Sequence, residues 1–342
     1  MDNITEIIRD DAKSIISRVD LSPLEGKFVV VTGATGLIGT YILACLDTFG
    51  KCKTVLRFAR HEPHPGQPSA HFCSKWAWTI QDLSDPRFSN LGRWGWPDYV
   101  FYAAGYGQPA KFINNPLTTI GINTTGLTGL LTSMSAGGRA LYVSSSEIYS
   151  GHTKPPFCEH EVGTTSPQHP RGCYIESKRC GEAICAAYNL ENRRNKALAA
   201  RVALAYGPGT KKDDDRAINQ FIRQAIVNRK IVLKDAGQVI RNYCYITDAV
   251  EFMLNIWLHG KYEVYNVGGK SKVTIAALAR KIGEICDVPV EIPSSANDVA
   301  APDNVTLDMR QAEGEFGKTS YFPLEEGLRR TIAWQRILYG QV

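Results

Sequence analysis

The stretch FVVVTGATGLIG, residues 28–39, decides the fold of this chain. It opens with an uninterrupted apolar run, Phe28–Val31, which is typical of a strand that is buried on both faces of a parallel sheet. A turn containing Gly33, Gly36 and Gly39 comes next, and an apolar helical segment follows the turn. This order of strand, glycine-rich turn and helix predicts the beginning of a doubly wound α/β fold.

The spacing of the glycines predicts a dinucleotide site in this turn. Gly33 permits the tight turn, Gly36 lets backbone N–H groups approach a pyrophosphate, and Gly39 allows the helix to pack closely against the strand. We assign the residues between them to the same cofactor site, namely Thr35, Leu37 and Ile38. A βα turn that contains glycines but binds no ligand is the alternative.

Further strand and helix patterns extend this unit. Apolar strands are expected at Thr54–Ala59, Tyr99–Ala103, Ala140–Ser144 and Ala197–Val202, with helices near 117–135 and 174–192. We therefore predict a parallel Rossmann sheet in a domain over residues 27–203. Residues 1–26 are predicted to form an amphipathic helical extension that packs on the body or on a second subunit. Its apolar positions are Ile4, Ile7, Ile8, Ala12, Ile15, Ile16 and Val19.

The pattern changes after residue 203. Short strands are expected near residues 231 and 243, and helices near 217–229, 247–258, 274–286 and 324–337. We predict a smaller C-terminal α/β lobe over residues 204–342 that binds the substrate, with 246–268 returning to the Rossmann domain. Because open α/β sheets bind ligands at the carboxyl ends of their strands, we expect the pocket between the two parts.

The composition excludes several classes of protein. Of the 342 residues, 44% are hydrophobic and 21% are charged, which argues against disorder and against a coiled coil. No apolar stretch is long enough to cross a bilayer, and the first residues lack the layout of a signal peptide, so we expect a cytoplasmic protein with no membrane partner. The net charge of +5, without a basic run interleaved with aromatics, argues against a nucleic-acid partner.

The cysteines and histidines predict neither disulfides nor a metal centre. Nine cysteines are scattered without a C-x-x-C pair, which fits reduced thiols in a cytosolic enzyme. His61 and His64 lie in a proline-rich loop, where a solvated turn is a simpler explanation than a zinc site.

Residues at the ends of later strands bear on the choice of cofactor. An NAD enzyme usually has an acid after its second strand, but here Arg60 occupies that place. Its guanidinium has three interpretations: a partner for the 2′-phosphate of NADP, a surface stacked on adenine, or a solvated residue. Asp82, followed by Leu83, either accepts from the adenine amino group or caps a turn. Ala103 and Ala104, after a further strand, complete the predicted cofactor site.

A tyrosine and a lysine four residues apart supply the candidate chemistry. Tyr174 and Lys178, in CYIESK, share one face of a helix. A lysine and a cationic nicotinamide beside the phenol favour the phenolate, which takes a proton from a carbinol while hydride leaves the same carbon. The SSSE segment at 144–147 ends a strand with groups that suit sugar hydroxyls, and capping of the loop is the alternative.

Together these motifs resemble a known family. TGATGLIG, SSSEIY, YIESK and RVALAYGP are similar to segments of the extended short-chain dehydrogenase/reductases that epimerise, dehydrate or decarboxylate nucleotide-linked sugars. The likeness spans residues 27–335, and the segment starting PRGCYIESKR is most similar to that of UDP-glucuronate decarboxylases. The resemblance implies a Rossmann fold, NAD as cofactor, with NADP as the alternative because of Arg60, and a nucleotide-sugar substrate.

The resemblance also assigns roles to residues. Tyr174 corresponds to the base at C4, Lys178 to the residue that holds the nicotinamide ribose, and Ser145 to the hydroxyl that binds the sugar 4-OH. Glu147 matches a glutamate that dehydratases and decarboxylases use beside C5 and C6. Ser146 stands where many glucose 4,6-dehydratases have an aspartate, which counts against ordinary glucose dehydration.

The C-terminal lobe contributes one further match and two departures. Arg241 matches an arginine near the diphosphate and the sugar, and an exposed arginine at a strand edge is the alternative. Leu204 replaces the family's usual asparagine, and Val305 replaces a basic residue. These departures imply an unusual sugar.

Taken together, we expect an NAD(P)-dependent enzyme that oxidises C4 of a nucleotide-linked sugar. Glu147 favours a decarboxylase or a 4,6-dehydratase, both of which are lyases. A 4-epimerase, or a plain C4 dehydrogenase or ketoreductase, is the enzymatic alternative. A dinucleotide-sensing regulator is the alternative without catalysis, although such proteins tend to lose the tyrosine or the lysine.

We also expect a homodimer. Many members of the family dimerise by packing the helix with the tyrosine and the lysine into a four-helix bundle. An apolar strip on this helix suits such a bundle, and an internal packing face is the alternative. The strip consists of Ala183, Ile184, Ala187 and Tyr188.

Overall fold

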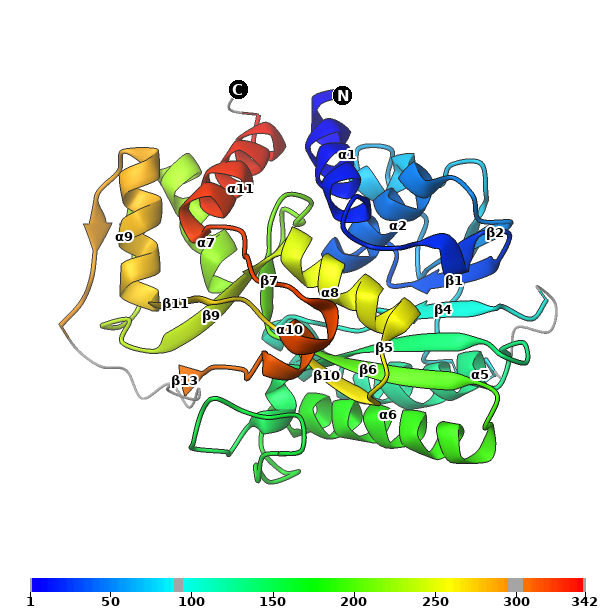
Figure 1. Ribbon diagram of the computed structural model, residues 1–342. Helices are drawn as coiled ribbons and strands as arrows, with labels where there is room; N and C mark the ends of the chain where they lie inside the picture. Colours follow the sequence, from blue (N-terminus) through cyan, green and yellow to red (C-terminus); the bar gives the residue numbers. More distant parts are fainter. Residues whose placement is uncertain (1, 86, 89–94, 295–303, 341–342) are drawn as a thin grey trace.

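A seven-stranded parallel sheet forms the centre of the larger part of the molecule (Figure 1). The computed structural model describes residues 2–85, 87–88, 95–294 and 304–340. The strand order is β10-β6-β5-β4-β1-β2-β3, and each neighbouring pair is parallel, so the predicted doubly wound fold is confirmed. The strands are β1 Phe28–Thr32, β2 Thr54–Ala59, β3 Trp78–Ile80, β4 Tyr99–Tyr102, β5 Arg139–Ser145, β6 Lys196–Val202 and β10 Val264–Val267.

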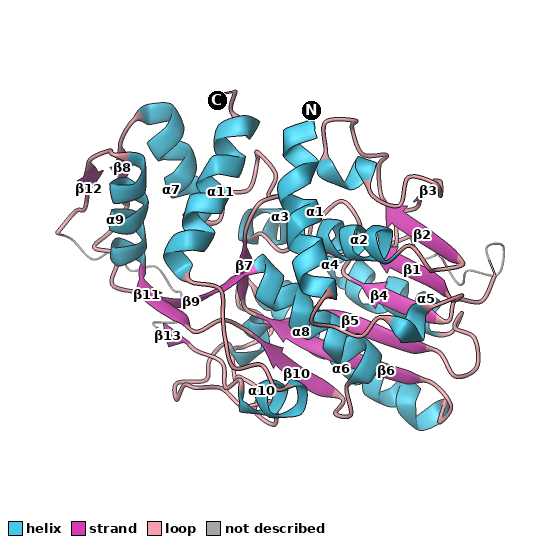
Figure 2. Ribbon diagram, turned by 45° about the horizontal axis from the view of Figure 1, so that its top comes forward, coloured by secondary structure: helices cyan, strands magenta, loops and turns pink. Residues whose placement is uncertain are grey.

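Helices cover both faces of this sheet (Figure 2). On one face lie α1 Asp2–Ile16, α2 Leu37–Phe49 and α8 Ile246–His259; on the other lie α4 Pro116–Gly121, the π-helical turn η3 Ile122–Gly126, α5 Leu127–Leu131 and α6 Gly172–Glu191. Because successive strand residues point to opposite faces, Val29 and Val31 enter one hydrophobic cluster and Val30 enters the other. Burial on both faces explains why β1 is apolar without alternation.

The N-terminal helix α1 packs on the body of its own subunit. Ile8, Ala12 and Ile15 are fully buried. The buried carboxylate of Asp11 accepts a hydrogen bond from the Tyr41 hydroxyl at 2.8 Å and, through its other oxygen, pairs with Arg330 in α11 (Leu324–Leu338) at 2.7 Å. The prediction gave two alternatives, packing on the body of the protein or on a second subunit. In the structure the helix packs on the body.

A smaller lobe stands beside the sheet. Its four-stranded sheet consists of β7 Leu204–Tyr206, β9 Ile240–Tyr245, β11 Ser271–Thr274 and β13 Asn304–Val305, and β8 Ile231–Val232 pairs with β12 Val290–Glu291. Its helical elements are α7 Ala217–Arg223, the π-helical turn η5 Gln224–Asn228, α9 Ile275–Cys286 and α11. The remaining short elements of the molecule are η1 Ser22–Leu24, η2 Pro68–His71, α3 Pro109–Asn114, η4 Ser146–Tyr149 and α10 Arg310–Phe316.

Part of the C-terminal half belongs spatially to the main sheet. Helix α8 packs on β5 and β6, and β10 pairs with β6 in the register Val264↔Ala199. This is where the sequence placed residues 246–268. The domain boundaries at residues 26 and 203 stay predictions.

The strand order reverses at β1, which lies between β4 and β2. The register Thr32↔Tyr102 brings the residues that follow β1 next to those that follow β4. Ligands of open α/β sheets bind at such a reversal, outside the carboxyl ends of the strands. The glycine-rich turn follows β1, so the fold positions it at this crevice.

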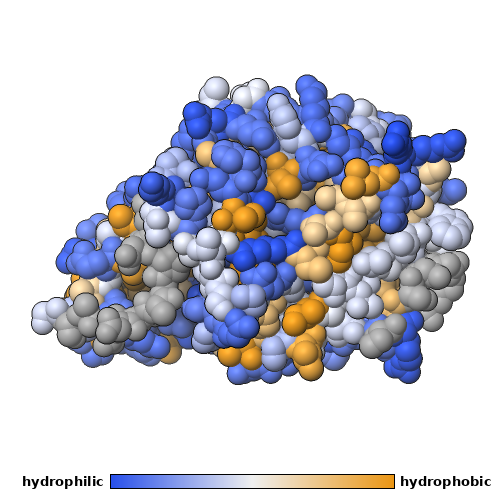
Figure 3. All heavy atoms as spheres, turned by 90° about the horizontal axis from the view of Figure 1, so that it is seen from below, coloured by the Kyte–Doolittle hydropathy of each residue, from blue (hydrophilic) through white to orange (hydrophobic). Residues whose placement is uncertain are grey.

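Helix α6 buries half of the apolar strip that we predicted for a dimer. Ile184 and Tyr188 pack into the hydrophobic cluster of the subunit, while Ala183 and Ala187 are exposed. The neighbouring helix α4 exposes 82% of Leu117. The face that carries α6 shows hydrophobic groups among polar ones (Figure 3). A second subunit would therefore meet a mixed surface that differs from the predicted strip.

The nine cysteines are free thiols, as predicted. Among the described residues, no helix is both long and apolar enough to cross a bilayer.

Candidate functional site

The glycine-rich turn lies directly against the end of β4. Gly33 has a φ of +62°, and a Cβ at this position would lie 2.2 Å from the carbonyl oxygen of Ala103. A Cβ at Gly39 would lie 2.3 Å from the carbonyl oxygen of Gly33. Both distances are far inside van der Waals contact, so only glycine fits. Gly36 differs, because it lines a cavity and a Cβ there would have one neighbour, at 3.2 Å.

This cavity, which we call the turn-side cavity, has a volume of about 490 Å³. Its lining includes eight of the residues assigned to the cofactor: Gly33, Thr35, Gly36, Arg60, Asp82, Leu83, Ala103 and Ala104. Leu37 and Gly39 line neither this cavity nor the next one described, and Ile38 lines the latter. The sequence did not point to four polar residues of the lining, namely Gln81, Lys111, Asn115 and Lys211.

The two ionisable groups predicted at the turn-side cavity have defined partners. Arg60 donates a hydrogen bond to the Tyr106 hydroxyl, and its guanidinium carbon lies 5.3 Å from the centroid of the Tyr106 ring. This arginine is therefore held at the cavity by an aromatic residue. Asp82 accepts from the backbone N–H of Ser84 at 2.9 Å and from its hydroxyl at 2.6 Å, so it caps a turn.

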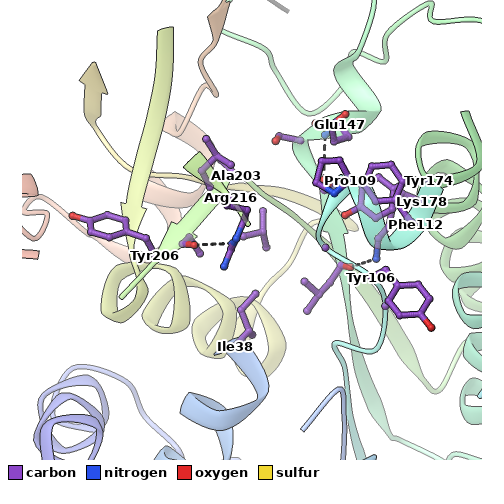
Figure 4. A pocket seen from close by; sticks show the side chains of 18 of the residues that line it. Ile38, Tyr106, Pro109, Phe112, Glu147, Tyr174, Lys178, Ala203, Tyr206 and Arg216 are labelled. Atoms are coloured by element: carbon purple, nitrogen blue, oxygen red, sulfur yellow. Dashed lines mark hydrogen bonds between the residues drawn. The ribbon is translucent and has the colours of Figure 1, made fainter. Parts of the chain in front are cut away.

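A second cavity, of about 460 Å³, adjoins the first, and residues 103–107 line both. We call it the tyrosine-side cavity. Every residue that the sequence assigned to catalysis or to the substrate lines it, namely Ser145, Ser146, Glu147, Tyr174, Lys178 and Arg241. Glu147, Phe112, Tyr174 and Lys178 lie together on one side, and Arg216 and Tyr206 lie on the other (Figure 4).

Tyr174 and Lys178 are both buried in the wall of the tyrosine-side cavity, and a Cβ at Gly105, which lines both cavities, would lie 3.7 Å from the Lys178 Nζ. Burial raises the pKa of Tyr174 to about 12, although a hydrogen bond with the Ser145 side chain lowers it in part. Burial lowers the pKa of Lys178 to about 7. The lysine Nζ donates to the carbonyl oxygen of Val143 at 2.8 Å and lies 5.8 Å from the Tyr174 ring centroid. The protein's own groups therefore do not produce the phenolate that we predicted, which requires a further positive charge.

A buried asparagine links helix α6, which carries the lysine, to strand β5 of the central sheet. Asn123, in η3, donates to the Ser177 hydroxyl at 3.1 Å and accepts from the Tyr142 hydroxyl at 2.9 Å. The Lys178 Nζ lies 4.7 Å from the Tyr142 ring centroid. Asn123 thus fixes the position of α6 around Lys178. A lone Asn in an apolar segment gives no signal in the sequence, and we did not predict it.

Glu147 is paired with an arginine that the sequence analysis did not single out. Arg171 Nη2 lies 2.6 Å from Glu147 Oε1, and the backbone N–H of Glu147 donates to Ser145 Oγ at 3.2 Å. The ring of Phe112 stacks on Tyr174 with centroids 4.5 Å apart, and the Arg171 guanidinium lies 5.7 Å from its centroid. The arginine was within the family-like PRGCYIESKR segment, whereas nothing in the sequence pointed to Phe112.

The opposite wall of the tyrosine-side cavity comes from the smaller lobe. Arg216 forms a bidentate ion pair with Asp214, with Nη2 to Oδ2 at 2.6 Å, and donates to the carbonyl oxygen of Ala205 at 3.1 Å. Arg241 and Leu204 line the same wall. Val305 is opposite Arg241 in the pairing of β13 with β9. Both departures from the family pattern, Leu204 and Val305, are thus on or beside this wall.

The fold and the two adjoining cavities define a class. A parallel sheet whose strand order reverses at a glycine-rich turn, with a cavity that backbone and small residues line, is the dinucleotide-binding Rossmann class.

Within that class the chain belongs to the NAD dependent epimerase/dehydratase family, whose model matches residues 29–268. The predicted relationship to enzymes that modify nucleotide sugars with NAD is confirmed.

Curated relatives are UDP-glucuronic acid decarboxylases. The chain is 26% identical over 329 residues to UDP-glucuronic acid decarboxylase 1 of Xenopus tropicalis, covering 92% of this chain and 74% of that protein. It is 26% identical over 304 residues to UDP-glucuronic acid decarboxylase 6 of Arabidopsis thaliana, covering 88% of this chain and 86% of that protein. These identities support the family and leave the reaction open.

Solved structures share the fold. UDP-glucose 4-epimerase of Thermotoga maritima, with UDP-glucose, superposes with a TM-score of 0.78 at 22% identity, covering 91% of this chain and 99% of that one. MoeE5 in complex with UDP-glucose and NAD gives a TM-score of 0.75 at 22% identity, with 91% and 99% coverage.

Proposed function

We propose that this protein oxidises C4 of a nucleotide-linked sugar and that decarboxylation or 4,6-dehydration follows from the ketone. The observation that carries the proposal is the convergence of Ser145, Glu147, Tyr174 and Lys178 on one cavity. These residues come from β5, η4 and α6. Residues 103–107 connect that cavity to the glycine-rich turn.

The turn-side cavity fits a dinucleotide. Gly36 leaves room beside the backbone N–H groups of the turn, as a pyrophosphate needs, and Lys178 lies beside Gly105, which lines both cavities. We propose NAD as the cofactor, held by the residues of the turn, by Asp82 and Leu83, and by Lys178. When bound, it supplies a hydride acceptor and a positive charge at the nicotinamide.

The residues around the sugar would act on the C4 hydroxyl. The Ser145 side chain interacts with the Tyr174 phenol and lowers its pKa in part, so both oxygens can contact one hydroxyl group. Tyr174 takes the hydroxyl proton as C4 loses its hydride and becomes a ketone. The Lys178 ammonium group, which donates a hydrogen bond to the Val143 carbonyl oxygen, supplies a further donor close to Tyr174.

Glu147 would act on the next carbons. A C4 ketone acidifies the C5 proton, and it makes a carboxylate on C5 a β-keto acid. In decarboxylation the C5–C6 bond breaks, carbon dioxide leaves, and its electron pair forms the C4 enolate, which is then protonated at C5. In dehydration the C5 proton and the C6 hydroxyl leave as water. For a net loss of only carbon dioxide or water, the hydride taken from C4 would return with a proton, to the C4 ketone after decarboxylation or to C6 after dehydration. A carboxylate beside the cavity at Glu147 suits either path.

The relatives favour decarboxylation, because curated proteins that match this chain over most of its length are named UDP-glucuronic acid decarboxylases. Ser146, at a position where many dehydratases have an acid, favours it too.

The test is the mass and stereochemistry of the product. The purified protein, loaded with NAD, is incubated separately with UDP-glucuronate and UDP-glucose and followed by mass spectrometry and NMR. Loss of one carbon dioxide from UDP-glucuronate supports the decarboxylase, and loss of one water from UDP-glucose supports the dehydratase. A product of unchanged mass with inverted C4 identifies an epimerase. Absence of turnover with both sugars contradicts the proposal for UDP-linked substrates.

NADP is the second candidate for the cofactor. Three cations line the turn-side cavity, Arg60, Lys111 and Lys211, whereas the acidic residue in its lining is Asp82. Lys111 is paired with Asp213 at 2.8 Å. The nicotinamide cofactor that co-purifies, identified by mass spectrometry, decides between the two.

We also propose a homodimer formed through α4 and α6, with Leu117, Ala183 and Ala187 in the contact. Light scattering of the wild type and of Leu117→Glu tests it, because a charge in the contact should yield a monomer.

A further inference from the structure

The ion pair between Glu147 and Arg171 sets the charge of the tyrosine-side cavity. Glu147 is one of two acidic residues in the described lining of that cavity, and the other, Asp215, pairs with Arg223 at 2.9 Å. The basic residues of the lining are Arg171, Lys178, Arg216 and Arg241, and Arg171 is the one that pairs with Glu147. Without Arg171, Glu147 would present an unneutralised carboxylate to the ligand.

Arg171 is held rigidly in place. It comes directly before α6, with its side chain 23% exposed and the Glu147 side chain 27% exposed. Its guanidinium lies over the ring of Phe112, whose other neighbour is the ring of Tyr174, with an angle of 10° between those two rings. Phe112 is 1% exposed. Arg171, Phe112 and Tyr174 thus form a layered stack, and the stack fixes the distance from the ion pair to the phenol.

Arg171 also has donor capacity left. A guanidinium carries five N–H groups. One nitrogen, Nη2, binds Glu147, and Nε is buried without a partner in the part of the chain that the structure describes. Arginine forms planar, multiple hydrogen bonds with carboxylates, which a lysine or a neutral residue cannot reproduce.

We propose that Arg171 is the residue that makes this cavity accept an acidic sugar. It neutralises Glu147, orients that carboxylate toward the reacting carbons, and offers its remaining donors to a second carboxylate, that of the sugar at C6. A neutral sugar does not need this compensation, so Arg171 determines specificity between a sugar acid and a neutral sugar. This inference rests on the proposed function, since it takes Tyr174 and Glu147 to face the sugar ring.

The test measures binding without turnover. In the NAD-loaded Tyr174→Phe protein, isothermal titration gives the Kd of UDP-glucuronate and of UDP-glucose. Adding Arg171→Met should raise the Kd of UDP-glucuronate by roughly 10-fold or more, because an unpaired Glu147 repels the sugar carboxylate. The Kd of UDP-glucose should change less than about 3-fold. Adding Glu147→Gln to this variant should restore UDP-glucuronate binding to within about 3-fold of the parent, because the repelling charge is gone.

Two further variants separate specificity from structure. Arg310→Met removes an arginine–carboxylate pair with Asp308 outside the two cavities and should leave both affinities unchanged. Arg171→Lys, made with Tyr174 intact, keeps the positive charge but loses the planar donors. It should keep the KM for UDP-glucuronate within about 3-fold while lowering kcat about 10-fold, because Glu147 is no longer oriented.

Equal weakening of both sugars by Arg171→Met would overturn the inference, since it would mean a general structural role. Failure of Glu147→Gln to restore binding would overturn it as well. A parent protein that binds neither sugar before Arg171 is changed is a different result, because it contradicts the proposed function itself.

Discussion

The two cavities that meet at residues 103–107 are built in different ways. The turn-side cavity is lined by residues that directly follow β1, β2, β3 and β4, and much of its wall is backbone and small side chains. The tyrosine-side cavity takes its polar side chains from β5, η4, α6 and the smaller lobe. The first depends on where the backbone runs, and the second depends on which side chains are paired.

This difference predicts which substitutions should affect cofactor binding and which should affect the chemical reaction. A substitution in the turn should disturb the backbone and the cofactor together. A substitution in the tyrosine-side cavity should alter chemistry and leave the cofactor bound. The following predictions test that separation.

The largest effect is expected for Tyr174→Phe. Removing the phenol oxygen removes the base that takes the C4 proton, so kcat should fall by about 10³-fold, or about 4 kcal/mol. The affinity for NAD should change less than about 3-fold, because the ring and its stacking on Phe112 remain. Steady-state kinetics and NAD titration measure the two values. Tyr262→Phe, at an exposed tyrosine, is the control. Retained turnover in Tyr174→Phe contradicts the assignment.

Gly33→Ala should be the most disruptive change in the turn. Its Cβ would lie 2.2 Å from the Ala103 carbonyl oxygen at a φ of +62°, so the turn must move, at a cost of about 3 kcal/mol in the free energy of unfolding. NAD binding should be lost with it. Urea unfolding and NAD titration are the measurements.

Gly26→Ala is the matched control for this change. Gly26 has a φ of +70°, but a Cβ there would meet nothing within 4 Å. Only the backbone strain remains, so the expected cost is about 1 kcal/mol with unchanged NAD affinity. Equal costs at the two glycines would show that the contact between the turn and β4 is unimportant.

The pH dependence of stability should report the burial of Lys178. Its pKa is lowered to about 7 in the folded protein, so above that pH the unfolded chain binds one proton more than the folded one. Stability from this group therefore rises with pH between the folded pKa and the usual lysine value. From about pH 7.5 to about pH 9, the wild type should gain about 2 kcal/mol relative to Lys178→Met.

Urea unfolding of protein stripped of cofactor at several pH values measures this gain. Lys53→Met, at an exposed lysine, should keep the wild-type slope. Parallel curves for the wild type and Lys178→Met would mean that Lys178 keeps its proton when buried.

The smallest effect is expected for Arg60→Ala. If the guanidinium contacts a 2′-phosphate, its loss should weaken the binding of NADP by about 5- to 10-fold, or about 1 kcal/mol. The binding of NAD should weaken by less than 2-fold. Tyr106→Phe removes the hydroxyl that accepts a hydrogen bond from Arg60, and it should weaken NADP binding in the same way but by a smaller factor. Competition binding measures the ratio. An equal loss for both cofactors would assign Arg60 to the adenine instead.

The main sheet was predictable because its strands are buried on both faces. Apolar runs such as Phe28–Val31 and Ala140–Ser144 predict buried strands, and this prediction does not depend on which helices pack against the sheet. In the smaller lobe, the sequence predicted the helices and the strands near residues 231 and 243, but not the other strands. Strands such as β12 and β13 have two residues each, and pairing with a distant strand, rather than local propensity, defines them.

For the candidate site, the sequence pointed to residues with a distinctive type at a distinctive spacing. Tyr174, Lys178 and Glu147 are of this kind, and they line one cavity. It did not point to Phe112, Asn123 or Arg216, because an aromatic, an amide and a surface-type arginine have ordinary roles at most positions. Burial raises the pKa of Tyr174 in the protein alone, and the phenolate expected beside a cationic nicotinamide stays a prediction.

The sequence by itself determined the family, the parallel sheet and the glycine-rich turn, because these follow from local patterns of apolar residues and glycines. Only the tertiary structure decided which side chains share a cavity and how their charges are paired. Arg171 lies 24 residues from Glu147 in the chain, yet the two make an ion pair of 2.6 Å. Such a contact depends on how η4 and the start of α6 pack together, and no local pattern encodes it.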